Sequence, residues 1–351
     1  MTSTHQNTIQ NTSTETLEED RSTGQSAGRK QLLHLSERFG LVGLLIALIA
    51  LFSILRPSTF ATLQNLQMVL SSQAVIAVAA LAVIIPLVGG RFDISVGSVL
   101  GLTSIAVAAA MSRYGLPLPV AVLVGVAIGA GIGAINGIIV SRLGVNSLVA
   151  TIGTSTIITG LITLYTKGIP ISSGISRTLT DLSITRIAQI PVLFLIMGII
   201  ALVVWYLLRL TPYGRRLQSV GENLSAARLV GIPVQRTILL SFVASGALAG
   251  VAGVLQVAQS GTGNPQVGGV EFLLPALAAA FLGATVIKPG TYNVLGTIIG
   301  LYFVGTIVSG LSLLGAQAWV QPVFNGTIVV VAVAISSYIG RRRSGGEPIG
   351  D

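Results

Sequence analysis

Long apolar stretches separated by short polar joints dominate the chain between residues 39 and 340. A helix that crosses a hydrocarbon core of about 30 Å needs about 20 apolar residues. The pattern therefore predicts an all-α polytopic membrane protein with about ten transmembrane helices. The predicted helices lie at about 39–55, 66–88, 94–112, 118–140, 147–166, 191–208, 237–259, 272–287, 291–314 and 319–339.

Composition agrees with a chain whose main solvent is lipid. Hydrophobic residues make up 52% and charged residues 9% of the 351 positions, whereas soluble domains contain roughly 25% charged residues. The 42 glycines suit close helix packing within a bilayer. The net charge of +9 is spread between apolar segments and does not cluster on one face, which argues against a nucleic-acid partner.

The sequence offers no residue set for catalysis or metal binding. The chain has no cysteine, and its two histidines, His5 and His34, both lie in the polar N-terminal part. Disulfides and a histidine-based metal or acid–base site are therefore not expected. We expect no catalytic residue, no metal and no cofactor.

Polar segments divide the chain into a membrane domain and two tails. Residues 1–38 are rich in Thr, Ser, Gln and Glu and have no apolar run, so we expect a disordered cytoplasmic tail. Residues 39–340 form the transmembrane domain, and 341–351 form a second cytoplasmic tail. Two longer loops interrupt the membrane domain, a polar outer loop at about 167–190 and an arginine-rich inner loop at about 209–236.

Positive charge predicts the orientation of the chain. With a cytoplasmic N-terminus, 15 of the 20 lysines and arginines fall on the cytoplasmic side, in agreement with the positive-inside rule. An odd number of spans would move the triplet Arg341 to Arg343 to the outside. We therefore expect a multi-pass protein of the inner (plasma) membrane with both termini in the cytoplasm.

Glycine patterns suggest two structural features. The halves on either side of the sixth span are faintly alike, which fits an inverted repeat of four helices, although abundant glycine also produces chance likeness. In the fourth span, glycines recur every four residues and share one helix face, at Gly125, Gly129, Gly133 and Gly137. This face fits tight packing inside one subunit, a dimer seam or a sliding surface.

Two charges stand at the joint between the second and third spans. Arg91 and Asp93 follow Gly89 and Gly90, and Pro86 lies just before them. Proline and glycine favour a broken backbone there, and Asp93 suits the N-terminus of the next helix, where a carboxylate meets the positive end of the dipole. We interpret this stretch, which continues through Ser95 and Gly97, as a hinge and helix cap. Direct contact with substrate is the alternative.

The inner loop contains a predicted short helix. Asn223 or Ser225 suits its N-cap, residues 226–230 can form it, and Gly231-Ile232-Pro233 ends it. This segment is either a plain connection or a docking surface for a cytoplasmic partner, with the arginines steering an acidic partner.

Several motifs in order resemble one family. Gly89-Gly-Arg-Phe-Asp-Ile-Ser-Val-Gly-Ser98 resembles the Gly-Gly-x-Asp-Leu-Ser-Val-Gly-Ser signature of ribose/xylose-type permeases of ABC importers, which share a superfamily with branched-chain amino-acid permeases. Residues 146–154, 221–232 and 281–300 are similar to further motifs of that family, and the resemblance covers roughly 40–340. The chain departs from the pattern by having the two residues Arg91-Phe92 before Asp93 where the pattern has one, by Asn146-Ser147 in place of Pro-Phe, and by its long N-terminal tail.

The resemblance implies partners. It implies a homo- or heterodimer of permease chains in membrane lipid, a cytoplasmic ATPase, and an extracytoplasmic sugar-binding protein. ATP hydrolysis then resides in the partner, so this chain is not an enzyme. The resemblance places contact with the ATPase at a coupling segment, which comprises Gly221, Glu222, Asn223, Ala226, Ala227, Arg228, Gly231 and Ile232.

The resemblance further implies inward transport of a monosaccharide such as ribose or xylose. A neutral sugar needs hydrogen-bonding groups along its path, and the polar candidates within or near the spans are Asn136, Asn146, Thr151, Thr154 and Asn325. Each of them could instead join helices by hydrogen bonds. Alternative functions are import of a nucleoside or a branched-chain amino acid, a secondary transporter with Asp93 as its coupling carboxylate, and a membrane-embedded enzyme.

Overall fold

The computed structural model describes residues 40–287, 290–317 and 319–343, so the predicted N-terminal tail and most of the C-terminal one lie outside the described residues. A helix at Gly40–Leu55 comes first. The elements that follow are α2 (Leu63–Val88), α3 (Val96–Ser112), α4 (Leu118–Ser141), α5 (Ser147–Thr166), α6 (Arg177–Ile184), β1 (Arg186–Ile187), β2 (Ile190–Pro191), α7 (Val192–Leu210), α8 (Pro212–Glu222), α9 (Leu224–Leu229), α10 (Val234–Ser260), α11 (Val270–Gly283), α12 (Val294–Leu313) and α13 (Val320–Arg343).

The fold is mostly helical, as expected for a polytopic membrane protein. Among the described residues, six helices are long and apolar enough to cross a membrane, namely α2, α4, α5, α7, α10 and α12. Four shorter apolar helices accompany them: Gly40–Leu55, α3, α11 and Val320–Val331. With 14 residues, α11 extends only about 21 Å, so the count of ten spans stays a prediction.

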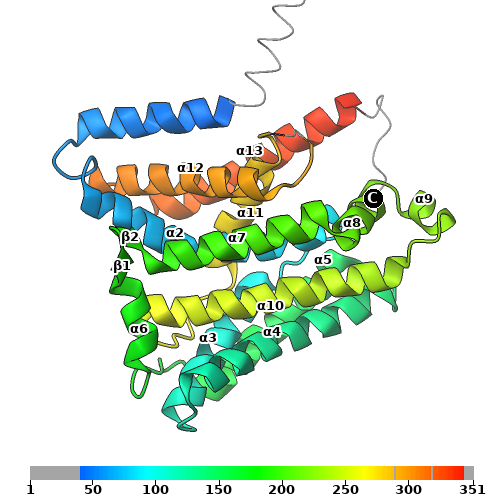
Figure 1. Cartoon of the computed structure of the whole chain (residues 1–351), viewed down its shortest axis with the longest axis horizontal. Coiled ribbons are helices and arrows are strands. Elements are labelled where there is room, and N and C mark those ends of the chain that lie inside the picture. The colour runs from blue at the N-terminus through cyan, green and yellow to red at the C-terminus, as the bar shows by residue number, and fades with distance from the viewer. Residues whose placement is uncertain (1–39, 288–289, 318, 344–351) are drawn as a thin grey trace, which may run out of the picture.

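The two ends of the helix bundle carry different connections (Figure 1). At one end lie α6 and the antiparallel hairpin β1–β2, and at the other lie α8 and α9. The hairpin departs from the all-α prediction, which treated 167–190 as a polar loop. Its turn uses Ala188 and Gln189, both with positive φ, where glycine or asparagine is the usual signal for a hairpin.

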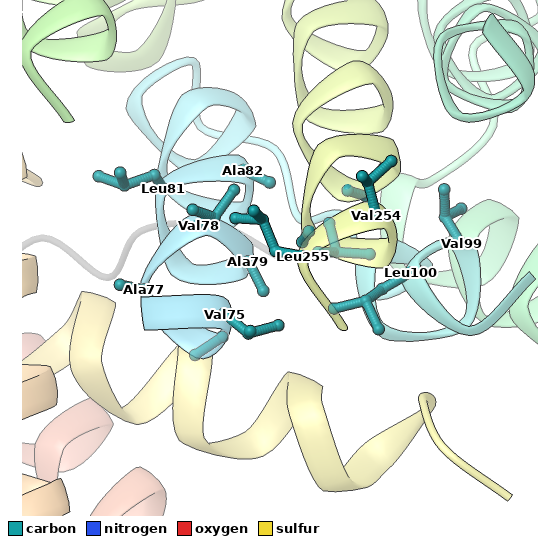
Figure 2. Packing of buried hydrophobic residues seen from close by; sticks show 14 of the residues in the cluster. Val75, Ala77, Val78, Ala79, Leu81, Ala82, Val99, Leu100, Val254 and Leu255 are labelled. Atoms are coloured by element: carbon teal, nitrogen blue, oxygen red, sulfur yellow. The ribbon is translucent and has the colours of Figure 1, made fainter. Parts of the chain in front are cut away.

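Small apolar side chains fill the centre of the bundle. In Figure 2, Val254 and Leu255 of α10 lie between Val78 on α2 and the pair Val99 and Leu100 on α3. These residues belong to one buried cluster. Because alanine and valine dominate it, the helices approach closely and the interior is densely packed.

The glycine face of α4 packs against α10. A Cβ on Gly129 would collide with the carbonyl oxygen of Gly246, and a Cβ on Gly246 would collide with that of Gly129. Gly133 meets Phe242 in the same way. Tight packing within one chain is therefore confirmed for this face, and α10 occupies the surface that a dimer seam would need.

Candidate functional site: a buried polar cluster and the coupling segment

The chain breaks its helical path between α2 and α3, as predicted. The amides of Gly89 and Arg91 both donate to the carbonyl of Pro86, at 2.9 and 3.0 Å. Gly90 takes a left-handed conformation with φ of 69°, which glycine adopts without steric penalty. The connection then turns inward and carries Asp93 into the bundle.

Asp93 is buried and held entirely by hydrogen bonds. Only 3% of its surface is exposed. Its Oδ1 accepts from the amide of Ser95 at 3.1 Å and from the Ser95 hydroxyl at 2.6 Å. Its Oδ2 accepts from the hydroxyl of Ser245 on α10, at 2.8 Å. No ion pair joins Asp93 to Arg91 in the part of the chain that the structure describes. The carboxylate instead accepts hydrogen bonds from Ser95, the residue before α3, and from Ser245 on α10.

The hydrogen-bonded chain continues from Asp93 into α4 and α5. The Ser95 hydroxyl accepts from Nδ2 of Asn136 at 2.9 Å, and Oδ1 of Asn136 accepts from the Thr154 hydroxyl at 2.6 Å. We call Asp93, Ser95, Asn136, Thr154 and Ser245 the polar cluster. It connects α3, α4, α5 and α10 at one buried point.

Two further hydroxyls of α5 satisfy backbone amides of the connection. The amide of Phe92 donates to Oγ of Ser147 at 3.2 Å, and the amide of Ile94 donates to Oγ1 of Thr151 at 3.1 Å. Backbone amides that are partly shielded from water still need such partners. The cluster and these bonds together fix the connection against α5.

The predicted polar residues separate into two groups. Asn136, Thr151 and Thr154 lie together around the connection, where their side chains bond other protein groups. Asn146 instead caps α5, since its Oδ1 accepts from the Leu148 amide at 2.9 Å. Asn325 is buried on α13, whose main packing partner is α11. Asn146 and Asn325 are therefore not members of the polar cluster.

Gly97, predicted as part of the hinge, has a packing role in the structure. A Cβ at this position would collide with the carbonyl oxygen of Gly269, just before α11. Gly101, one turn later, meets Val267 similarly. The start of α3 thus lies directly against the connection between α10 and α11.

Sequence reasoning missed Ser245 as a partner of the predicted hinge. The available signal was a hydroxyl between Ala244 and Gly246 in an apolar span, and such residues often bond across helices in membranes. Nothing in the sequence indicated that its partner is Asp93, which lies 152 positions away.

The inner loop forms two short helices, and the coupling segment comprises α9 and the last residues of α8. Thr211 caps α8 by accepting from the Gly214 amide at 3.2 Å, and Asn223 caps α9 by accepting from the Ala226 amide at 2.9 Å. The predicted short helix capped by Asn223 is confirmed, and α8 was not predicted. Leu229 and Val230 at the end of α9 are 88% and 76% exposed, so the tip presents apolar side chains outside the bundle.

Contacts of α8 fix the coupling segment to the membrane helices. The Tyr213 hydroxyl donates to the carbonyl of Thr237 on α10 at 3.2 Å. Burial raises the pKa of Tyr213, which keeps this hydroxyl protonated. At the other end of α8, a Cβ on Gly221 would collide with the carbonyl oxygen of Val88, and the Gly221 backbone also packs on Gly90.

Comparison with known proteins gives a consistent result. The family described as "Branched-chain amino acid transport system / permease component" matches residues 65–333. The chain is 34% identical over 307 residues to the ribose import permease protein RbsC of Escherichia coli K12, which covers 86% of this chain and 94% of the relative. It is 30% identical over 305 residues to the D-allose transport system permease protein AlsC of the same strain, covering 87% and 93%. It is 34% identical over 290 residues to the autoinducer 2 import system permease protein LsrC of Enterobacter sp. 638, covering 81% and 83%. No solved structure matches the chain.

Proposed function

The chain belongs to the family of permease components of branched-chain amino acid transport systems, and we propose that it is the permease of an ATP-driven importer for a monosaccharide. The observation that carries this proposal is similarity over most of the chain to permeases named for ribose and allose. The interior agrees with a neutral solute, because Asp93 is the one carboxylate of the polar cluster and hydroxyls and an amide accompany it.

The proposed partner at α9 is the ATPase. ABC importer permeases act with an ATPase and a substrate-binding protein. Here α9 has an apolar tip at Leu229 and Val230, beside Arg228, and its cap at Asn223 fixes the helix before the partner arrives. Exposed apolar residues rimmed by charge are typical of an interaction site.

Motion of α9 would pass to the polar cluster through α8. Gly221 touches Val88 and Gly90 backbone to backbone, so α8 and the connection 89–95 have no flexible side chain between them at this point. A cavity of about 530 Å³ beside this joint is lined by Gln218 and Glu222 of α8 and by Tyr292, which gives α8 room to move. Coupling of this kind requires that contacts differ between the two states of transport.

The polar cluster then serves as the hinge. Its bonds hold α3, α4, α5 and α10 together in the described conformation. Among Asn136, Thr151 and Thr154, only Thr154 is partly exposed. Thr154 is therefore the proposed contact for sugar hydroxyls, and Asn136 and Thr151 are proposed to position the hinge.

The proposed topology has ten spans in residues 39–340, with both termini on the cytoplasmic side together with α8 and α9. Packing supports an inverted repeat in which α2–α5 correspond to α10–α13. In the first half α3 and α4 pack on α10, and in the second half α11 and α12 pack on α2. The importer contains a second permease chain, identical or related.

Import of a branched-chain amino acid is the second candidate, because it is the transport named in the family description. It differs from the first in its solute, which carries an ammonium and a carboxylate. Uptake of each solute, measured in one preparation, distinguishes the two candidate functions. Competition by an excess of unlabelled leucine, but not by ribose, would favour the amino acid.

ATP-dependent uptake tests the proposal. The chain is reconstituted in liposomes with its ATPase and binding protein, and uptake of radiolabelled ribose, xylose and allose is measured with and without ATP. We expect ATP-dependent uptake of one of these sugars. Deletion of 223–231 is expected to abolish it while membrane insertion is unchanged. Normal uptake by the deletion variant, or uptake driven by a proton gradient alone, would contradict the proposal.

A further inference from the structure

A large apolar cavity lies between α3, α4 and α5, away from the polar cluster. Its volume is about 680 Å³. Apart from two tyrosines at one end, its lining consists of aliphatic side chains. The residues that define its walls include Leu102, Ile105, Ala106, Ile128, Leu161 and Tyr165. Such a lining offers a sugar no hydrogen bond over most of its length.

The cavity has the depth of one membrane leaflet. From Leu102 to Ala110, the α3 wall of the cavity extends about 12 Å along the helix. This is a little less than half of a hydrocarbon core of about 30 Å, and Tyr114 and Leu116 continue the lining beyond the end of α3. Its tyrosine end coincides with the ends of α3 and α5 that lie opposite α8 and α9, so it opens toward the membrane surface remote from the coupling segment.

Aromatic and cationic groups surround this end. Tyr114 is 68% exposed and Tyr165 is 40% exposed, as in the aromatic belts of membrane proteins. The guanidinium carbon of Arg113 lies 4.6 Å from the centroid of the Tyr165 ring. Within the described residues no carboxylate forms an ion pair with Arg113, which leaves its positive charge available to an anion.

We propose that a membrane phospholipid occupies this cavity, with one acyl chain between α3, α4 and α5 and its phosphate bound by Arg113. The groups along the cavity complement a phospholipid in order. The aliphatic interior suits an acyl chain, and the aromatic rim and the cation beyond it suit the interface and the phosphate. Arginine binds phosphate through charge-assisted hydrogen bonds. The lipid would fix the outer halves of these three helices.

Lipid retention by the full chain tests this site. The chain is purified from vesicles of palmitoyl-oleoyl phosphatidylglycerol, and bound lipid is counted by native mass spectrometry. Ala106→Phe places a ring inside the cavity, and Arg113→Gln removes the charge at its mouth. The matched controls are Ala127→Phe, at an exposed position of α4 outside the cavity lining, and Arg56→Gln, at an exposed position after the first described helix.

We expect the wild type and both controls to retain one lipid that Ala106→Phe lacks. Arg113→Gln is a change at the surface that leaves the fold intact. We expect this variant to bind the lipid about tenfold more weakly, which corresponds to a loss of about 1.4 kcal/mol in binding free energy. Equal retention by all variants would overturn the proposal. Reduced dimerisation of Ala106→Phe with unchanged lipid would also overturn it, in favour of a second copy at this face. The measurement involves no transport, so a negative result would contradict the lipid site and leave the proposed transport function untouched.

Discussion

Single polar side chains hold the connection between α2 and α3 in place. Asp93 is buried, no ion pair reaches it from the residues that the structure describes, and the hydroxyls of Ser95 and of Ser245 on α10 donate to it. The sequence predicted a cap at this position because a carboxylate before an apolar run suits a helix N-terminus. It could not predict Ser245, since a bond across 152 positions depends on how α10 packs.

Replacement of Asp93 tests the hinge and cap. Asp93→Ala removes the acceptor for buried hydroxyls on α3 and α10, and each unsatisfied group costs about 1–3 kcal/mol. We expect a marked fall in the thermal unfolding temperature in detergent and a loss of uptake, with a smaller effect for Asp93→Asn. The control is Asp181→Ala on the exposed face of α6. An Asp93→Asn variant with unchanged folding and uptake would remove the support for this role.

A hydrogen bond joins two of the stretches where the sequence departs from the expected family motifs. The amide of Phe92 donates to Oγ of Ser147 at 3.2 Å. Ser147→Ala is expected to lower the free energy of unfolding by about 1 kcal/mol, because the partly buried amide of Phe92 loses its acceptor. Chemical denaturation in detergent measures this. Ser155→Ala, on the same helix, is the control, and an equal effect of both changes would mean that the bond contributes nothing.

At the scale of elements, the spacing of residues predicted which face of a helix is packed, but not which helix packs against it. Glycines four residues apart predicted a close approach on α4, but α10 as the opposing helix came only with the structure. The helix α8 was missed, although Thr211-Pro212 is a good N-cap and first-turn pair. The arginine-rich sequence of α8 resembled a loop, because the apolar face of this helix is too short to be recognised from the sequence.

The crossing of α4 and α10 makes a prediction with a control on the same helix. Gly129→Ala forces a methyl group onto the backbone of Gly246, and such overpacking costs about 1–3 kcal/mol. Gly131→Ala, at a position where nothing lies within 4 Å, is expected to be neutral or stabilising by up to about 1 kcal/mol. Unfolding temperatures compare them, and similar values would show that the helices can separate without loss.

For the whole molecule, hydropathy was sufficient to predict a helical membrane protein and the approximate position of most of its helices. The hairpin β1–β2 was not predictable, because its turn residues Ala188 and Gln189 carry no turn signal. The contact between the coupling segment and the hinge was also invisible, although Gly221 and Gly90 were each singled out. Two glycines far apart in sequence do not reveal that their backbones touch.

That contact joins the proposed site of ATPase docking to the polar cluster, and one measurement tests it most directly. In liposomes with the ATPase and binding protein, ATP hydrolysis and sugar uptake are recorded together for the wild type, Gly221→Ala and the exposed control Ser219→Ala. We expect Gly221→Ala to hydrolyse ATP while uptake falls about tenfold, equivalent to about 1.4 kcal/mol, and Ser219→Ala to match the wild type. An unchanged ratio of sugar moved to ATP hydrolysed in Gly221→Ala would contradict transmission through this joint.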